Sequence, residues 1–170
     1  MNRPLAEMLR YNHWANRRLF EACRALTAEQ LARRMPEASG SVGELLLHIA
    51  GGQQTFVLRT RGRQHEGEFT RQSPWPGFDA VFKALDVSSQ ELVLIAEGLD
   101  VDSEVDLPWM GKAYRFPVSF FLVHAMAHGV EHRTEVKLTL SHFGFETPDL
   151  DAWSYAPEAG YGQEVGPARR

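Results

Sequence analysis

Residues 124–132 have the sequence HAMAHGVEH, in which His124, His128 and His132 are spaced four residues apart. Side chains four residues apart on an α-helix point from one face, so two such imidazoles can bind a single metal ion. All three cannot, because eight residues of helix rise about 12 Å, whereas a zinc–nitrogen bond measures about 2.0–2.1 Å. The segment therefore predicts a metal site that takes one histidine pair from this helix and another ligand from elsewhere.

The histidine segment lies in the last of four long helices that the spacing of apolar residues predicts. Pro4 and Pro117 suit the first turns of the first and fourth helices, and Ser41 with Glu44 forms a capping box before the second. The four predicted ranges are 4–23, 41–59, 79–99 and 117–140. This order predicts an all-α protein, a four-helix bundle.

Two other segments interrupt the helical pattern. Between Asp100 and Phe116, alternating apolar residues on either side of Gly111 predict a small β-hairpin between the third and fourth helices. From Thr60 to Gly77 the chain is polar and rich in glycine and proline. This second segment predicts a loop that is long enough to cover part of the protein.

The size of the chain fits one domain. With 170 residues, 44% apolar and 24% charged, it has the composition of an ordinary globular protein that can bury a sufficient core. We expect a single helical-bundle domain over residues 1–155. The glycine- and proline-rich residues 156–170 are expected to form a flexible tail.

Charge and cysteine content narrow the class of protein. A formal net charge of −4 argues against a nucleic-acid partner, which usually requires a basic face. Cys23 is the only cysteine, so the chain has no intramolecular disulfide and fits a reducing compartment. We find no secretory signal and no apolar run of the about 20 residues that a membrane span needs. We therefore expect a cytoplasmic protein without a membrane partner.

A further histidine can complete the metal site. His48 lies on the apolar stripe of the second helix, and Gly52, one turn later, leaves space beside it. A histidine alone on such a stripe is commonly a core residue. A facing histidine together with an HxxxH pair, however, favours one shared explanation, a metal site that uses them all. Three neutral imidazoles and an open position are typical of catalytic zinc sites and also suit nickel.

The direction of the helices selects the pair. His48 lies about one and a half turns into its own helix, so in an antiparallel arrangement it meets the late part of the fourth helix. This arrangement favours His128 and His132 as the ligands. His124 is then left as a packed or supporting neighbour of the site.

Two asparagines stand in the middle of an otherwise apolar stripe on the first helix. Asn12 and Asn16 either mark a hydrated edge of the stripe or face a polar site halfway along the helix. In the second interpretation they orient a substrate or a group bound at the metal.

The segment HGVEH, residues 128–132, also matches the HxxEH pattern of some metallopeptidases, in which the glutamate is the general base. A peptidase would also need a third ligand, normally a carboxylate, and a cleft for an extended peptide. The sequence indicates no sheet edge that could hold one, so this alternative is less favoured. Glu131 is otherwise a solvated helix residue or an acceptor that orients an imidazole.

Four segments together resemble the DinB/YfiT-like superfamily. They are YNHWAN at 11–16, SVGELLLHI at 41–49, the histidine segment through Arg133, and TPDLD at 147–151. The resemblance covers nearly the whole chain. It implies a four-helix bundle, commonly dimeric, with a divalent metal held by His48, His128 and His132. The usual His-Arg-Gly ending is His-Arg-Thr here, with Thr134 in place of glycine.

The resemblance also implies a range of functions. Characterised relatives include metal-dependent transferases that use low-molecular-weight thiols such as bacillithiol or mycothiol, and a maleylpyruvate isomerase. We therefore expect a zinc- or nickel-dependent small-molecule enzyme, a thiol-dependent S-transferase or a hydrolase, linked to stress or detoxification. It would act as a homodimer on a small-molecule substrate. The alternatives are a non-catalytic metal- or ligand-binding stress protein and a purely structural bundle without metal.

Overall fold

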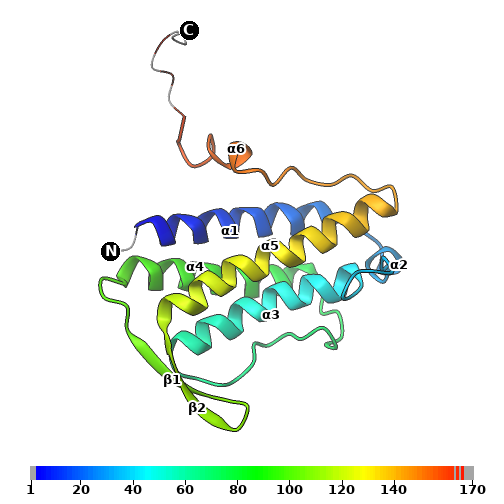
Figure 1. Ribbon diagram of the computed structural model, residues 1–170. Coiled ribbons are helices and arrows are strands. Elements are labelled where there is room, and N and C mark those ends of the chain that lie inside the picture. The colour runs from blue at the N-terminus through cyan, green and yellow to red at the C-terminus, as the bar shows by residue number, and fades with distance from the viewer. Residues whose placement is uncertain (1–2, 163, 165, 167–170) are drawn as a thin grey trace.

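The fold is mostly helical, as the computed structural model shows for residues 3–162, 164 and 166 (Figure 1). The long helices are α1 (Arg3–Cys23), α3 (Val42–Thr60), α4 (Phe78–Gly98) and α5 (Val118–His142). The shorter elements are α2 (Ala28–Leu31), β1 (Glu104–Trp109), β2 (Lys112–Pro117) and α6 (Ala152–Tyr155). The four long helices and the hairpin that the sequence predicts are confirmed.

The long helices lie side by side, and each packs mainly against two others. Helices α1 and α3 both contact α4 and α5, so the four surround one shared interior (Figure 1). Two apolar clusters fill the interior. One is centred on Phe20, Leu46 and Leu85, and the other on Leu9 and Leu122.

A polar network joins all four long helices inside this interior. Arg133 of α5, only 3% exposed, donates from Nη1 to Oδ1 of Asn12 at 2.5 Å and of Asn16 at 2.7 Å. Both asparagines of α1 donate from Nδ2 to Oε1 of Gln53 on α3. Gln53 in turn donates from Nε2 to Ser89 Oγ of α4 at 2.7 Å. The network therefore satisfies a buried cation with amide oxygens and fixes the helices relative to one another.

The start of α3 is fixed by its capping box. Ser41 Oγ accepts from the backbone N–H of Glu44, and the Glu44 carboxylate accepts from the backbone N–H of Ser41 at 2.7 Å. Both halves of the predicted box are therefore present. They satisfy two N–H groups that the first turn leaves free.

The hairpin and the predicted loop lie beside α3. Strands β1 and β2 pair antiparallel, and the turn Met110–Gly111 has φ values of 47° and 76°, as in a two-residue turn with two left-handed residues. The loop approaches α3 so closely that a Cβ on Gly51 would lie 1.8 Å from the carbonyl oxygen of Phe69. Glycine at 51 is therefore what lets the loop pack directly on the helix backbone.

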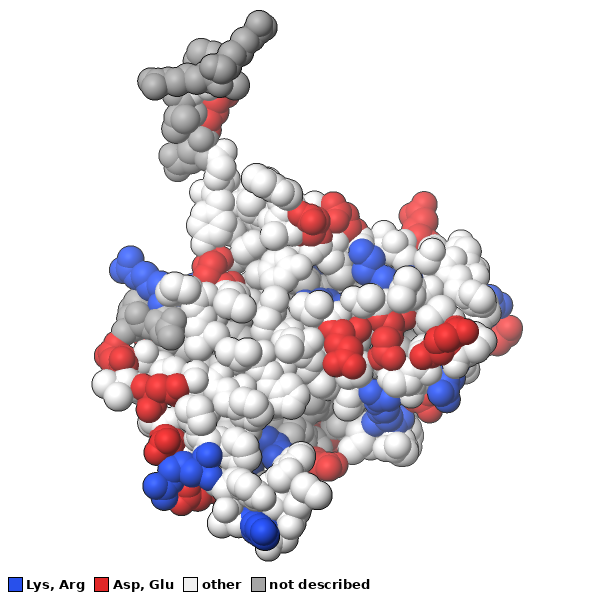
Figure 2. All heavy atoms as spheres, in the orientation of Figure 1, with Lys and Arg blue, Asp and Glu red and all other residues white. Residues whose placement is uncertain are grey.

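No helix in the described part of the chain is both long and apolar enough to cross a membrane. On the face shown in Figure 2, basic and acidic side chains are interspersed, with uncharged stretches between them.

In the predicted tail, Glu158 accepts a hydrogen bond from Arg18, and Tyr161 donates its backbone N–H to Ala156. Residues 163, 165 and 167–170 of that segment lie outside the described residues, and its flexibility stays a prediction.

We expect Gln53→Met to lower the free energy of unfolding by about 2 kcal/mol or more, because it leaves buried N–H groups of Asn12 and Asn16 without their acceptor. Urea unfolding followed by circular dichroism measures the change. The matched control is Gln90→Met, at an exposed position of α4. Its effect should stay within about 0.5 kcal/mol, and an equal loss in both variants would show that the network is not a source of stability.

Candidate metal centre

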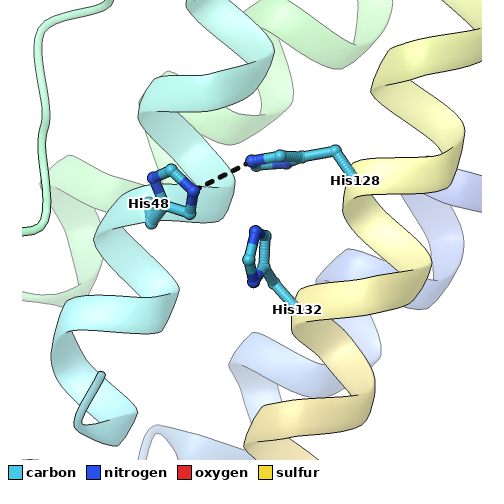
Figure 3. A group of neighbouring side chains, drawn as sticks. All are labelled: His48, His128 and His132. Carbon is cyan, nitrogen blue, oxygen red and sulfur yellow. Dashed lines mark hydrogen bonds between the residues drawn. The ribbon is translucent and has the colours of Figure 1, made fainter. Parts of the chain in front are cut away.

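Three histidines converge between α3 and α5 (Figure 3). One nitrogen each from His48, His128 and His132 lies within 4.8 Å of the others. Nε2 of His48 and Nε2 of His128 are 3.0 Å apart, and the ring centroids of all three pairs are separated by 4.4–4.6 Å. The structure thus brings together the three residues that the sequence predicts as ligands.

The antiparallel direction of α3 and α5 produces this convergence. His48, near the start of α3, faces His128 and His132, whereas Phe56, near the end of α3, lies 4.6 Å from His124 between ring centroids. His124 is therefore one turn away from the three histidines. Its ring centroid is 6.3 Å from that of His128.

The chemistry of these side chains fits a divalent ion. Two nitrogens bound to one tetrahedral ion lie about 3.3 Å apart, close to the 3.0 Å between His48 and His128. Burial lowers the pKa of His48 to about 4 and that of His128 to about 3. Both imidazoles are thus neutral at pH 7, which is the form that binds metals. Such a site could hold zinc or another late first-row ion.

Glu135 orients the third histidine, and the sequence interpretation missed it. Its Oε2 lies 2.6 Å from Nδ1 of His132. A carboxylate acceptor there places the ring hydrogen on Nδ1 and leaves the Nε2 lone pair for a ligand. Glu135 follows His132 by three residues, a spacing that puts both on one helix face and that could have identified it.

The segment before α3 holds Glu135 in turn. Ser39 donates to its carboxylate from the backbone N–H and from Oγ, each at 2.9 Å. Burial alone would raise the pKa of Glu135, but the hydrogen bonds from His132 and Ser39 hold that pKa below its usual range. Glu135 is therefore an ionised acceptor, supported from two elements.

Gly52 makes room for the ring of His128. A Cβ at this position would lie 2.6 Å from Cε1 of that ring, closer than any real contact of this kind. The space that the sequence predicts beside His48 is therefore occupied by the ring of the facing His128.

The other predicted site residues lie outside the three-histidine group. Asn12 and Asn16 are buried and hydrogen-bonded to Gln53 and to Arg133, the residue after His132, and neither forms a hydrogen bond with the three histidines in the described structure. Glu131 is exposed. Among the three converging histidines, the carboxylate that contacts an imidazole is that of Glu135, so the geometry gives the peptidase interpretation no support.

A cavity of 810 Å³ opens onto His48 and His128. It lies between α3, α5, the hairpin and the loop after α3, so the loop covers the site as its length predicts. Seven aromatic residues line it: Phe56, Phe69, Trp109, Tyr114, Phe116, Phe120 and Phe121. The charged side chains on its wall are Arg59, Arg71 and Glu66.

Comparison with known proteins agrees with the sequence resemblance. A sequence model of the DinB family matches residues 1–165. The crystal structure of a DinB-like protein from Bacillus cereus superposes with a TM-score of 0.62 at 19% identity, over 85% of this chain and 94% of that chain. At that identity the likeness concerns the fold. No curated protein sequence matches the chain.

The lowered histidine pKa values predict acid sensitivity of the metal-free protein. In the unfolded chain these groups take up protons near pH 6.5, but in the folded protein His48 does so only at about 4 and His128 at about 3. The unfolded state therefore binds more protons within this window, and stability should fall as the pH drops from 6.5 to 4. Thermal unfolding across this range, with chelator present, measures the slope.

His128→Gln should flatten that slope because it removes the histidine whose pKa is lowered to about 3. His65→Gln, at an exposed loop histidine, is the control and should leave the slope unchanged. If both variants keep the slope of the unmodified protein, the buried imidazoles are not its source.

Gly52→Ala should weaken zinc binding at the three histidines, because the added methyl group displaces the His128 ring. Competition with a chromogenic zinc chelator measures the affinity. Gly98→Ala is the control, since a Cβ at that position of α4 meets nothing within 4 Å. Unchanged zinc affinity in Gly52→Ala would mean that the ring position does not govern binding.

Proposed function

This chain belongs to the DinB family, and from that premise we propose that it is a divalent-metal-dependent enzyme that acts on a small molecule. The reaction class that we propose is thiol-dependent S-transfer or hydrolysis, with zinc or nickel as the ion. The observation that supports this most is the convergence of three histidine nitrogens beside an 810 Å³ cavity. We also take the four long helices to be the four-helix bundle of this family.

The site has room for an exogenous ligand. In the described part of the chain, no carboxylate or cysteine joins the three histidines as a fourth ligand. Three protein ligands and one open position are typical of catalytic rather than structural zinc sites. When bound, such an ion lowers the pKa of a thiol or water that it contacts.

The surrounding residues favour an anion beside the histidines. The charge of Arg71 acts on both His48 and His128 and contributes to their lowered pKa values. Arg71 is held in place because its Nη1 donates to the carbonyl oxygen of Ser39 at 2.8 Å. A cation held beside the histidines would stabilise a thiolate or another developing negative charge.

The aromatic walls suit the body of an organic substrate. Phe69 is buried, and Phe121 is 3% exposed, whereas Trp109 and Tyr114 of the hairpin remain about half exposed. The inner wall is thus buried and apolar, and the hairpin forms an outer rim. Such a cavity orients a small apolar molecule and excludes water from its reacting end.

Protein purified without an affinity tag should carry about one zinc or nickel ion per chain, as measured by elemental analysis. His128→Ala should lose it at neutral pH. Glu135→Gln should keep the site but bind the ion about 10–100-fold more weakly, because His132 loses its charged acceptor. His142→Ala, at the exposed end of α5, is the control. Stoichiometric metal in His128→Ala would contradict the site.

The same preparations test the reaction. Metal-loaded protein, given a low-molecular-weight thiol and a fluorogenic electrophile, should accelerate thiol conjugation, and both a chelator and His128→Ala should abolish that acceleration. Metal binding without conjugation by any common thiol would rule out the transferase and leave hydrolysis. Hydrolysis is then assayed on small ester and amide substrates.

A further inference from the structure

We infer that the cavity beside the three histidines accepts a small molecule with an aromatic or similarly flat apolar body and one anionic group, and that Arg59 receives that anion. This inference rests on the proposed function, which assigns the reacting end of the ligand to the three histidines, and it adds the chemical class of the ligand. The observations that carry it concern the cavity wall and the charge of Arg59.

The wall provides stacking surfaces for a flat ligand. Phe116 stacks on Phe120 with ring centroids 5.5 Å apart and an interplanar angle of 24°. Phe120 and Phe56 both contact the ring of His124, at 5.8 Å and 4.6 Å between centroids. These rings come from α3, α5 and β2, so the stacking surface is built by three separate elements. Offset and edge-to-face contacts with such rings favour aromatic ligands.

Arg59 is a half-buried cation without a partner among the described residues. It lies in the last turn of α3 and lines the cavity. In the described part of the chain, its guanidinium forms no hydrogen bond and no salt bridge. Its neighbour Arg61, by contrast, pairs with Glu91 at 3.1 Å. A partly desolvated guanidinium presents several unused donors, and a carboxylate or sulfonate matches their geometry.

The charges on the cavity wall favour an anion. Two arginines and one carboxylate, Glu66, line the cavity, and within the described residues Glu66 pairs with neither arginine. Arg71 acts on His48 and His128, whereas Arg59 acts on His124, whose pKa burial and this charge lower. The two cations therefore serve different parts of the cavity.

This separation gives the ligand an orientation. His48 and Arg59 are about three turns apart on α3, a rise of about 16 Å. An anion at Arg59 would therefore place the far end of an extended ligand at the histidines. Arg59 is thus a specificity-determining residue that positions the substrate and takes no part in bond breaking.

A matched pair of fluorescent probes tests the inference. Anilinonaphthalenesulfonate carries the anion, and phenylnaphthylamine has the same ring system without it. We expect the unmodified protein to bind the sulfonate more tightly. Arg59→Gln should weaken sulfonate binding about tenfold, the usual effect of losing one charge-assisted hydrogen bond, and should leave the neutral probe unaffected. Fluorescence titration measures both affinities.

Arg63→Gln is the control, because it removes the same charge from an exposed residue four positions further on that does not line the cavity. Equal affinities of the two probes for the unmodified protein would overturn the inference, as would failure of both to bind. So would an equal loss in Arg59→Gln and Arg63→Gln. The probe comparison on the unmodified protein does not depend on the folding of any variant.

The titrations are made on metal-free and on zinc-loaded protein. If the chain binds no metal, the proposed function fails, but the preference for the anion remains measurable in the metal-free protein. If zinc binds and the preference is absent, only the substrate inference fails. The two outcomes are therefore distinguishable.

Discussion

The burial of one positive charge is the constraint on which this structure depends. Arg133 has no carboxylate partner in the described chain, and desolvation lowers its pKa to about 10, so it remains charged at neutral pH. Its charge is satisfied only where the amide oxygens of Asn12 and Asn16 meet it, with Gln53 behind them. A shift of one helix would break several of these bonds together, which makes the arrangement cooperative.

The candidate metal centre inherits its geometry from this constraint. Arg133 and His132 are adjacent on α5 and point into different parts of the interior. The network around Arg133 fixes the rotation of α5 about its axis, and this rotation also sets the direction of the His132 side chain. Glu135, itself bound by Ser39, then holds the imidazole of His132 through Nδ1. The three histidines are therefore preorganised before any ion binds, which reduces the entropic cost of binding.

Much of the fold follows from local sequence, because periodicity, capping and turn signals act within a few residues. The HxxxH spacing and the facing His48 likewise predicted the residues that converge. The hydrogen-bond partners of the buried polar side chains could not be predicted from local sequence. The sequence left Asn12 and Asn16 either at a hydrated edge or facing a site, whereas the structure buries them against Arg133 and Gln53. The role of Arg59 was missed because it depends on which elements face it across the fold, and spacing along one helix does not encode this. Glu135 was missed although its three-residue spacing from His132 places both on one helix face.

The adjacent glycines 51 and 52 have a consequence for how this protein can change. Gly51 admits the loop, and Gly52 admits the His128 ring. Each lowers intrinsic helix stability by about 1 kcal/mol relative to alanine. Selection for thermal stability alone would thus favour alanine at exposed helical glycines but be blocked at this pair. Helix α3 therefore retains a weak point at its centre, and stability gained elsewhere in the chain must compensate for it.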